Sequence, residues 1–97
     1  MIIKGNQIDI QNGRRPYELD GRQIVLKHFV VRVTRPENPF KPHRHAQPEL
    51  WYIIDGTAIV SLDGVEYAVE GGDLIVIDEQ VEHGLRTEDK ATWICLG

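Results

Sequence analysis

The sequence predicts an all-β protein, a sandwich or closed barrel of short antiparallel strands with little or no helix. Two observations lead to this fold class. No long stretch carries apolar residues at the i, i+3, i+4 spacing of an amphipathic helix together with a helix cap. Instead, short runs of β-branched and aromatic residues recur with turn dipeptides between them. Closure of such strands would also remove exposed strand edges.

The individual strands are predicted from these runs and from the turns that separate them. Turn signals are the dipeptides Asp-Gly and Gly-Gly, and Asp-Gly between alternating apolar runs is a strong hairpin signal. At least two antiparallel hairpins are therefore expected. Prolines are concentrated in residues 35–48, which predicts a loop-rich segment there rather than a central strand. The predicted strands are residues 23–33, 49–54, 57–62, 65–69, 73–77 and 91–96.

Length and charge limit the number of domains and the kinds of partner that this chain can have. A chain of 97 residues suits one domain, and its net charge of −4, without a basic run, argues against nucleic acid as a partner. Cys95 is the only cysteine, so no intrachain disulfide is expected. The N-terminal segment MIIKGNQIDI is interrupted by polar residues, so neither a signal peptide nor a membrane span is expected, and the predicted location is cytoplasmic.

Candidate metal ligands are concentrated in the stretch PHRHAQPELWYIIDG. His43 and His45 are two residues apart, so in an extended segment both imidazoles point to the same side. Glu49 follows at the start of a predicted strand and adds a carboxylate oxygen to the two nitrogens. His83 supplies a further imidazole if strand 73–77 returns beside this segment. Nitrogen ligands with one carboxylate suit iron, manganese, nickel, cobalt or zinc better than calcium or magnesium.

The spacing of these residues resembles the motifs of the cupin superfamily. HxHxxxExxxxxxG, from His43 to Gly56, is similar to the first cupin motif, and GDLIVIDEQVEH, from Gly72 to His83, is similar to the second. The resemblance implies one cupin domain over residues 1–97, with motif one at about 42–56 and motif two at about 72–87. It also implies a single antiparallel β-barrel of the jelly-roll type. The departures from the family pattern are Glu37, Asp78, Gln80 and Thr87, none of which is a ligand position.

The resemblance implies a 3-His-1-Glu site that holds one divalent transition metal (Fe, Mn, Ni, Co or Zn) through His43, His45, Glu49 and His83. A small oxygen-rich organic substrate would then undergo isomerase, lyase, decarboxylase or dioxygenase chemistry, with Glu49 as the candidate catalytic base. The alternative is a noncatalytic module that binds a small molecule and holds a structural metal. The absence of a fused domain in this sequence favours an enzyme. The sequence does not identify the reaction.

Other residues near the motifs have candidate roles outside the set of four metal ligands. Trp51 and Ile53 share the parity of Glu49 along its strand, so both should face the interior and line a pocket, although an ordinary core role is at least as consistent with the pattern. His28 is left out of the metal site, and Cys95 is expected to be a small buried residue. Residues 1–11 alternate like a strand without a hairpin partner, so a homodimer is predicted.

Overall fold

The computed structural model describes residues 1–97 and contains eight strands and one short 3-10 helix. All strand pairs between the named strands are antiparallel, which confirms the predicted all-β class. No helix is long and apolar enough to cross a bilayer. The elements are β1 Ile2–Ile3, η1 Gly5–Gln7, β2 Phe29–Thr34, β3 Phe40–His43, β4 Glu49–Leu62, β5 Val65–Glu70, β6 Leu74–Ile77, β7 His83–Arg86 and β8 Ala91–Leu96.

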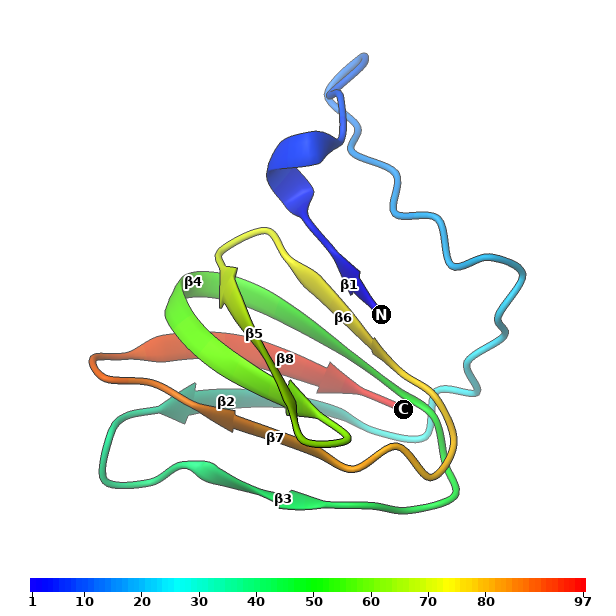
Figure 1. Ribbon diagram of the computed structural model, residues 1–97. Coiled ribbons are helices and arrows are strands. Elements are labelled where there is room, and N and C mark those ends of the chain that lie inside the picture. The colour runs from blue at the N-terminus through cyan, green and yellow to red at the C-terminus, as the bar shows by residue number, and fades with distance from the viewer.

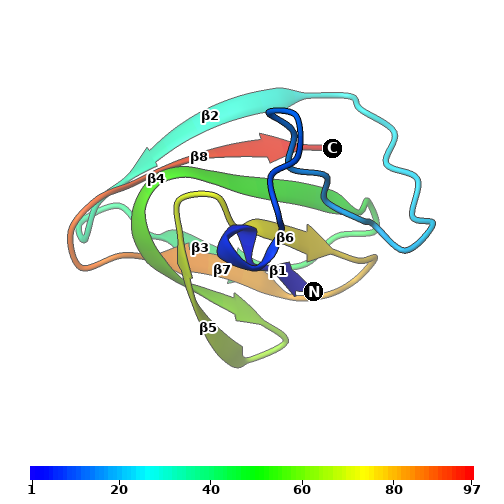
Figure 2. The same ribbon diagram turned by 90° about the horizontal axis from the view of Figure 1, so that it is seen from above.

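The strands form two layers that share the long strand β4 (Figure 1). In the first layer, the first part of β4 pairs with β6 and β8; β6 also pairs with β1, and β8 also pairs with β2. In the second layer, the last part of β4 pairs with β5 and β7, and β7 also pairs with β3. Figure 2 shows β4 curving from one layer into the other. The result is a jelly-roll-like arrangement, but the sheet does not close, because β1, β2, β3 and β5 each pair with one neighbour.

The curvature of β4 is produced at Gly56. The register between β4 and β8 shifts between Ile53 and Asp55, which marks a bulge, and Gly56 follows with a φ of 90°. A Cβ atom at Gly56 would lie 2.1 Å from the carbonyl oxygen of Lys90, so only glycine fits this position. The expectation of two strands separated by an Asp55-Gly56 turn was therefore wrong: the dipeptide bends one continuous strand.

Other strand boundaries also differ from the predicted ones. Residues 23–28 are not strand; the N–H groups of Lys27 and His28 both donate to the carbonyl oxygen of Gly97, at 3.0 and 2.8 Å. Strand β3 lies inside the segment predicted to be a loop, but it pairs only with β7, so proline is tolerated there. Strand β7 was not predicted because its sequence, HGLR, contains no β-branched residue.

The core lies between the two layers and is built around two tryptophans. Trp51 on β4 and Trp93 on β8 are fully buried, and their ring centroids are 4.6 Å apart. Ile53 is also fully buried and belongs to the same cluster. Because apolar residues alternate along β4 and β8, one face of each strand contributes to this core. The core sits directly beside His83, which is itself fully buried.

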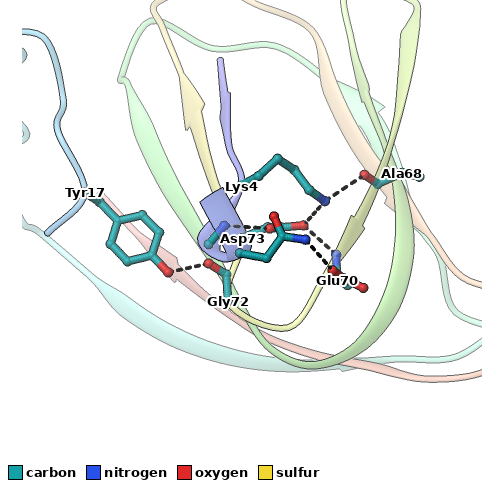
Figure 3. Close-up of polar contacts among 8 residues, drawn as sticks. Lys4, Tyr17, Ala68, Glu70, Gly72 and Asp73 are labelled. Atoms are coloured by element: carbon teal, nitrogen blue, oxygen red, sulfur yellow. Dashed lines mark hydrogen bonds and ion pairs between the residues drawn. The ribbon is translucent and has the colours of Figure 1, made fainter. Parts of the chain in front are cut away.

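The N-terminal segment is held to the first layer by the buried carboxylate of Asp73 (Figure 3). Lys4 forms an ion pair with this carboxylate, the N–H of Gly5 donates to Oδ1 at 3.0 Å, and the N–H of Glu70 donates to Oδ2 at 2.7 Å. The hydroxyl of Tyr17 donates to the carbonyl oxygen of Gly72 nearby. Asp73 therefore fixes both the N-terminus and the turn between β5 and β6.

We expect Asp73→Ala to lower the free energy of unfolding by about 3 kcal/mol, because it leaves buried N–H donors and the Lys4 ammonium without their acceptor. Urea denaturation measures this loss. The matched control is Glu66→Ala, which removes an ion pair with Arg86 whose two side chains are both 54% exposed, and which should cost less than about 1 kcal/mol. Equal losses in the two variants would contradict the role assigned to Asp73.

Candidate metal centre

Three of the four predicted ligands are histidines that the strand pairing brings together. The register between β3 and β7 places His43 directly opposite His83, and their ring centroids are 4.4 Å apart. His45 follows β3, with its ring centroid 4.8 Å from that of His83. One nitrogen from each ring lies within 4.8 Å of the corresponding nitrogens of the other two. The predicted return of strand 73–77 beside the first motif is confirmed, since Ile77 pairs with Glu49.

Hydrogen bonds to the backbone orient two of these rings. His83 Nδ1 lies 2.7 Å from the carbonyl oxygen of Val81, and His43 Nδ1 lies 3.2 Å from that of Lys41. Because a carbonyl oxygen only accepts, each Nδ1 must carry the proton when it makes this bond. The neutral rings then present Nε2 as a lone pair, which is the arrangement found in histidines that ligate metals.

Two buried imidazole nitrogens of the cluster have no hydrogen-bond partner. These are Nε2 of His83, whose side chain is fully buried, and Nδ1 of His45. Buried polar atoms are nearly always satisfied, so an unpartnered imidazole nitrogen in such a place requires an explanation. A bound metal ion would satisfy His83 Nε2 directly. The donor set thus fits the metal that the sequence motifs imply.

Glu49 approaches the three histidines from the opposite layer. Its side chain is 9% exposed, with Oε2 3.4 Å from Nε2 of His45 and Oε1 3.6 Å from Nε2 of His83. Trp51 Nε1 donates to Oε1 at 3.2 Å and so limits the orientations of the carboxylate. Glu49 therefore lies near two of the three histidines, while the group whose ligand atoms all lie within 4.8 Å of one another contains the histidines alone. Imidazole nitrogens with a carboxylate oxygen nearby suit borderline transition metals.

Trp51 and Ile53 both point into the interior, but only Trp51 reaches the cluster. Its ring centroid is 5.3 Å from that of His83, in addition to its hydrogen bond with Glu49. Ile53 packs in the hydrophobic core. The parity argument along β4 was sufficient to place both side chains inside, but not to separate a residue at the site from a residue of the core.

The sequence interpretation left out two residues that reach Glu49. His28, just before β2, has Nε2 3.6 Å from Glu49 Oε2 and 3.6 Å from the sulfur of Cys95. The pKa of Cys95 is raised to about 11, mainly by burial of the thiol and secondly by the nearby Glu49 carboxylate. Cys95 lies opposite Trp51 in the pairing of β8 with β4, so its side chain faces inward. One sequence feature could have indicated that His28 faces inward: it is two residues from Val30, which packs against the core.

Burial lowers the pKa of His83 below its usual range, opposed in part by the hydrogen bond to Val81. Below about pH 6.5 the unfolded chain therefore takes up a proton that the native state resists, and the free energy of unfolding falls with acid. We expect this fall in chelator-treated protein when urea denaturation at about pH 5.5 is compared with about pH 7.5. The fall should be smaller in His83→Gln; identical pH dependence in both proteins would contradict this assignment.

Comparison with known proteins defines the class to which this fold and cluster belong. The profile of the cupin domain family matches residues 29–97, which is more than two thirds of the chain. The chain belongs to the cupin family. The match covers every strand except β1, and it contains all four predicted ligands.

One characterised relative is similar in sequence. It is the dimethylsulfoniopropionate lyase DddW of Ruegeria pomeroyi, which is 37% identical over 68 residues. The alignment covers 68% of this chain but 45% of the relative, so the chain spans less than half the length of that lyase.

Solved structures with similar folds are more distant in sequence. A predicted oxalate decarboxylase from Thermotoga maritima superposes with a TM-score of 0.68 at 18% identity, over 73% of this chain and 64% of that one. A cupin-2 domain protein from Shewanella frigidimarina gives a TM-score of 0.63 at 20% identity, over 71% of this chain and 67% of that one. At these identities the likeness establishes the fold alone.

Proposed function

We propose that this chain binds one divalent transition metal through His43, His45, Glu49 and His83 and acts as a lyase on a small, oxygen-rich carboxylate. The observation that carries the metal site is the fully buried Nε2 of His83, which has no hydrogen-bond partner and faces two further imidazoles. The lyase chemistry is suggested by the relative from Ruegeria pomeroyi, whose named substrate is a carboxylate.

In this proposal His43, His45, Glu49 and His83 would hold the metal, which would supply Lewis-acid chemistry toward a carboxylate oxygen of the substrate. Glu49, whose carboxylate oxygens lie 3.4 Å from His45 Nε2 and 3.6 Å from His83 Nε2, accepts a proton from the carbon next to the substrate carboxylate. The electrons of that C–H bond form a C=C bond, and the group on the following carbon leaves with the electrons of its own bond. Trp51 cannot take this role, since an indole N–H only donates. Its bond to Oε1 keeps the carboxylate oriented toward the histidines, and the surrounding core excludes water from that side.

The experiment loads purified protein with Fe(II), Mn(II), Ni(II), Co(II) or Zn(II) and screens turnover of dimethylsulfoniopropionate, oxalate and other small carboxylates. We expect metal-dependent cleavage of at least one of them, with product identified by mass spectrometry. Including keto acids and sugar acids, with and without dioxygen, also tests the isomerase and dioxygenase chemistries that the family resemblance implies. A protein that binds metal and turns over none of these compounds would contradict the lyase proposal.

The second candidate function is a noncatalytic module that binds a small molecule and holds a structural metal. One observation favours it: a cleft of about 540 Å³ is lined by Lys27, Pro48 and Gly97 but by none of the ligand histidines. Calorimetry with the same carboxylates identifies this case, as binding without turnover.

The homodimer also remains a proposal, but its basis changes. The predicted unpaired N-terminal strand has a partner within the chain, because Ile2 pairs with Ile75 and Ile3 with Leu74. Among the strands with a single partner, β2 pairs only with β8 and has exposed apolar side chains. We also propose that residues 1–97 form one cupin domain. The cytoplasmic location of the protein stays a prediction.

We expect β2 to pair with β2 of a second copy. Phe29, Val31 and Val33 alternate along the strand and are 61%, 56% and 46% exposed, so a row of apolar side chains borders the free edge. An antiparallel pair about a twofold axis at Val31 would join the two rows. Light scattering should give a dimer for the wild type and a monomer for Val31→Lys. A wild-type monomer across micromolar concentrations would contradict this arrangement.

A further inference from the structure

A second cluster of ligand-type side chains lies beside the three histidines. It consists of His28, Cys95 and Glu49, which contribute an imidazole nitrogen, a sulfur and a carboxylate oxygen. The three atoms lie within 4.8 Å of one another. They come from three segments, because His28 precedes β2, Cys95 lies on β8, and Glu49 begins β4. None of the three histidines of the first site belongs to this cluster.

Two of the three separations in this cluster are close to those between ligands of a tetrahedral ion. Bonds of about 2.3 Å to sulfur and about 2.0 Å to nitrogen or oxygen put tetrahedral ligand pairs about 3.3–3.6 Å apart. The observed distances are 3.6 Å from Cys95 Sγ to His28 Nε2 and 3.6 Å from that nitrogen to Glu49 Oε2. The nitrogen-to-oxygen distance exceeds that of a normal N–H···O hydrogen bond, whereas the sulfur-to-nitrogen distance is within hydrogen-bond range for sulfur, so the thiol contacts His28 even without an ion.

The surroundings leave one side of this cluster open. Cys95 and Glu49 are buried, whereas the side chain of His28 is 45% exposed. An ion could therefore enter past His28, with water as its fourth ligand. Glu49 Oε2 lies 3.4 Å from His45 Nε2 and 3.6 Å from His28 Nε2, so the same carboxylate faces both clusters. Carboxylates in this position bridge the ions of two-metal sites.

We propose that His28, Cys95 and Glu49 bind a second divalent ion of borderline or soft character, such as Zn²⁺, Co²⁺ or Cd²⁺, next to the three-histidine site. The thiolate sets the preference, because sulfur ligands select softer metals than imidazole and carboxylate alone. This site goes beyond the proposed function, which requires only the first ion, and it would make Glu49 a shared ligand. Binding would release the thiol proton of Cys95 to solvent.

The test is a titration of chelator-treated, full-length protein with Co²⁺ near neutral pH, in which bound cobalt is counted and the near-ultraviolet absorption is recorded. Cys95 is the only cysteine, so a sulfur-to-cobalt charge-transfer band can come only from this residue. Such a band requires a bond between cobalt and the sulfur, so it reports binding at the second cluster directly. We expect the band in the wild type and two cobalt ions per chain.

Variants separate the two sites. Cys95→Ser and His28→Ala should abolish the band and keep one cobalt ion, whereas His45→Ala should keep the band and lose the other ion. Cys95→Ala and His28→Gln repeat the test, and thermal unfolding of each variant verifies its fold. Cobalt bound by the wild type without a band would overturn the second site and leave the proposed function standing. A band lost in His45→Ala, or kept in His28→Ala, would also overturn it.

Discussion

His83→Gln is expected to lower the affinity for a first transition-metal ion by at least about 100-fold, which is the upper range for loss of a residue that merely supports a ligand. His83 is fully buried, and its Nδ1 is fixed by Val81, so no other side chain can supply the missing Nε2 lone pair. The measurement is competition for Ni(II) against a chelator of known affinity. His45→Ala should show a similar loss.

The matched control is His28→Ala, which removes an imidazole at a comparable distance from Glu49 but outside the three-histidine cluster. It should leave the affinity for the first nickel ion within a few-fold of the wild type. Thermal unfolding distinguishes loss of the ligand from loss of the fold in His83→Gln. Full metal content in both His83→Gln and His45→Ala would show that the ion, if any, binds elsewhere.

Glu49→Gln is expected to keep most of the metal but to lose at least about 100-fold in turnover, the lower range for removing a general base. An amide oxygen can still occupy the ligand position, and the three imidazoles remain. However, the amide carries no negative charge and accepts no proton in place of the carboxylate. Because Trp51 Nε1 donates to Oε1, the amide oxygen can take the same place without rearrangement.

The readout is turnover at saturating metal, with bound metal measured in the same samples. Trp51→Phe is the comparison variant: it removes the hydrogen bond to Glu49 and keeps a large buried ring, so it should reduce turnover less than Glu49→Gln does. If Glu49→Gln turns over substrate as fast as the wild type, Glu49 is not the proton acceptor. If it loses all its metal, the carboxylate is an essential ligand.

The fold class and the ligand cluster were predictable from short-range patterns. Period-two alternation marks the strands on both sides of the core, and the spacing of His43, His45 and Glu49 allows one point of convergence. The partner of this segment was predictable only through the second motif. The register that sets His43 opposite His83 depends on β3 and β7, two short strands that local propensity does not indicate.

What could not be predicted involves geometry that local sequence does not determine. Asp55-Gly56 resembles a hairpin turn, but a bulge and the close approach of Lys90 make it the bend of one strand. The position of His28 depends on the pairing of β2 with β8, which joins residues 57 to 67 positions apart in the sequence. Such long-range contacts place His28 next to Cys95 and Glu49, whereas the alternation within residues 23–33 indicates only that His28 shares a face with Val30.

The most direct test of the metal site is anomalous diffraction from crystals of the protein loaded with Ni(II) or Zn(II), recorded at the absorption edge of the metal. The account predicts a strong peak about 2.1 Å from Nε2 of His83 and of His43, with His45 and Glu49 completing the coordination. A crystal with metal in its fluorescence spectrum but no anomalous peak among these four side chains would contradict the account.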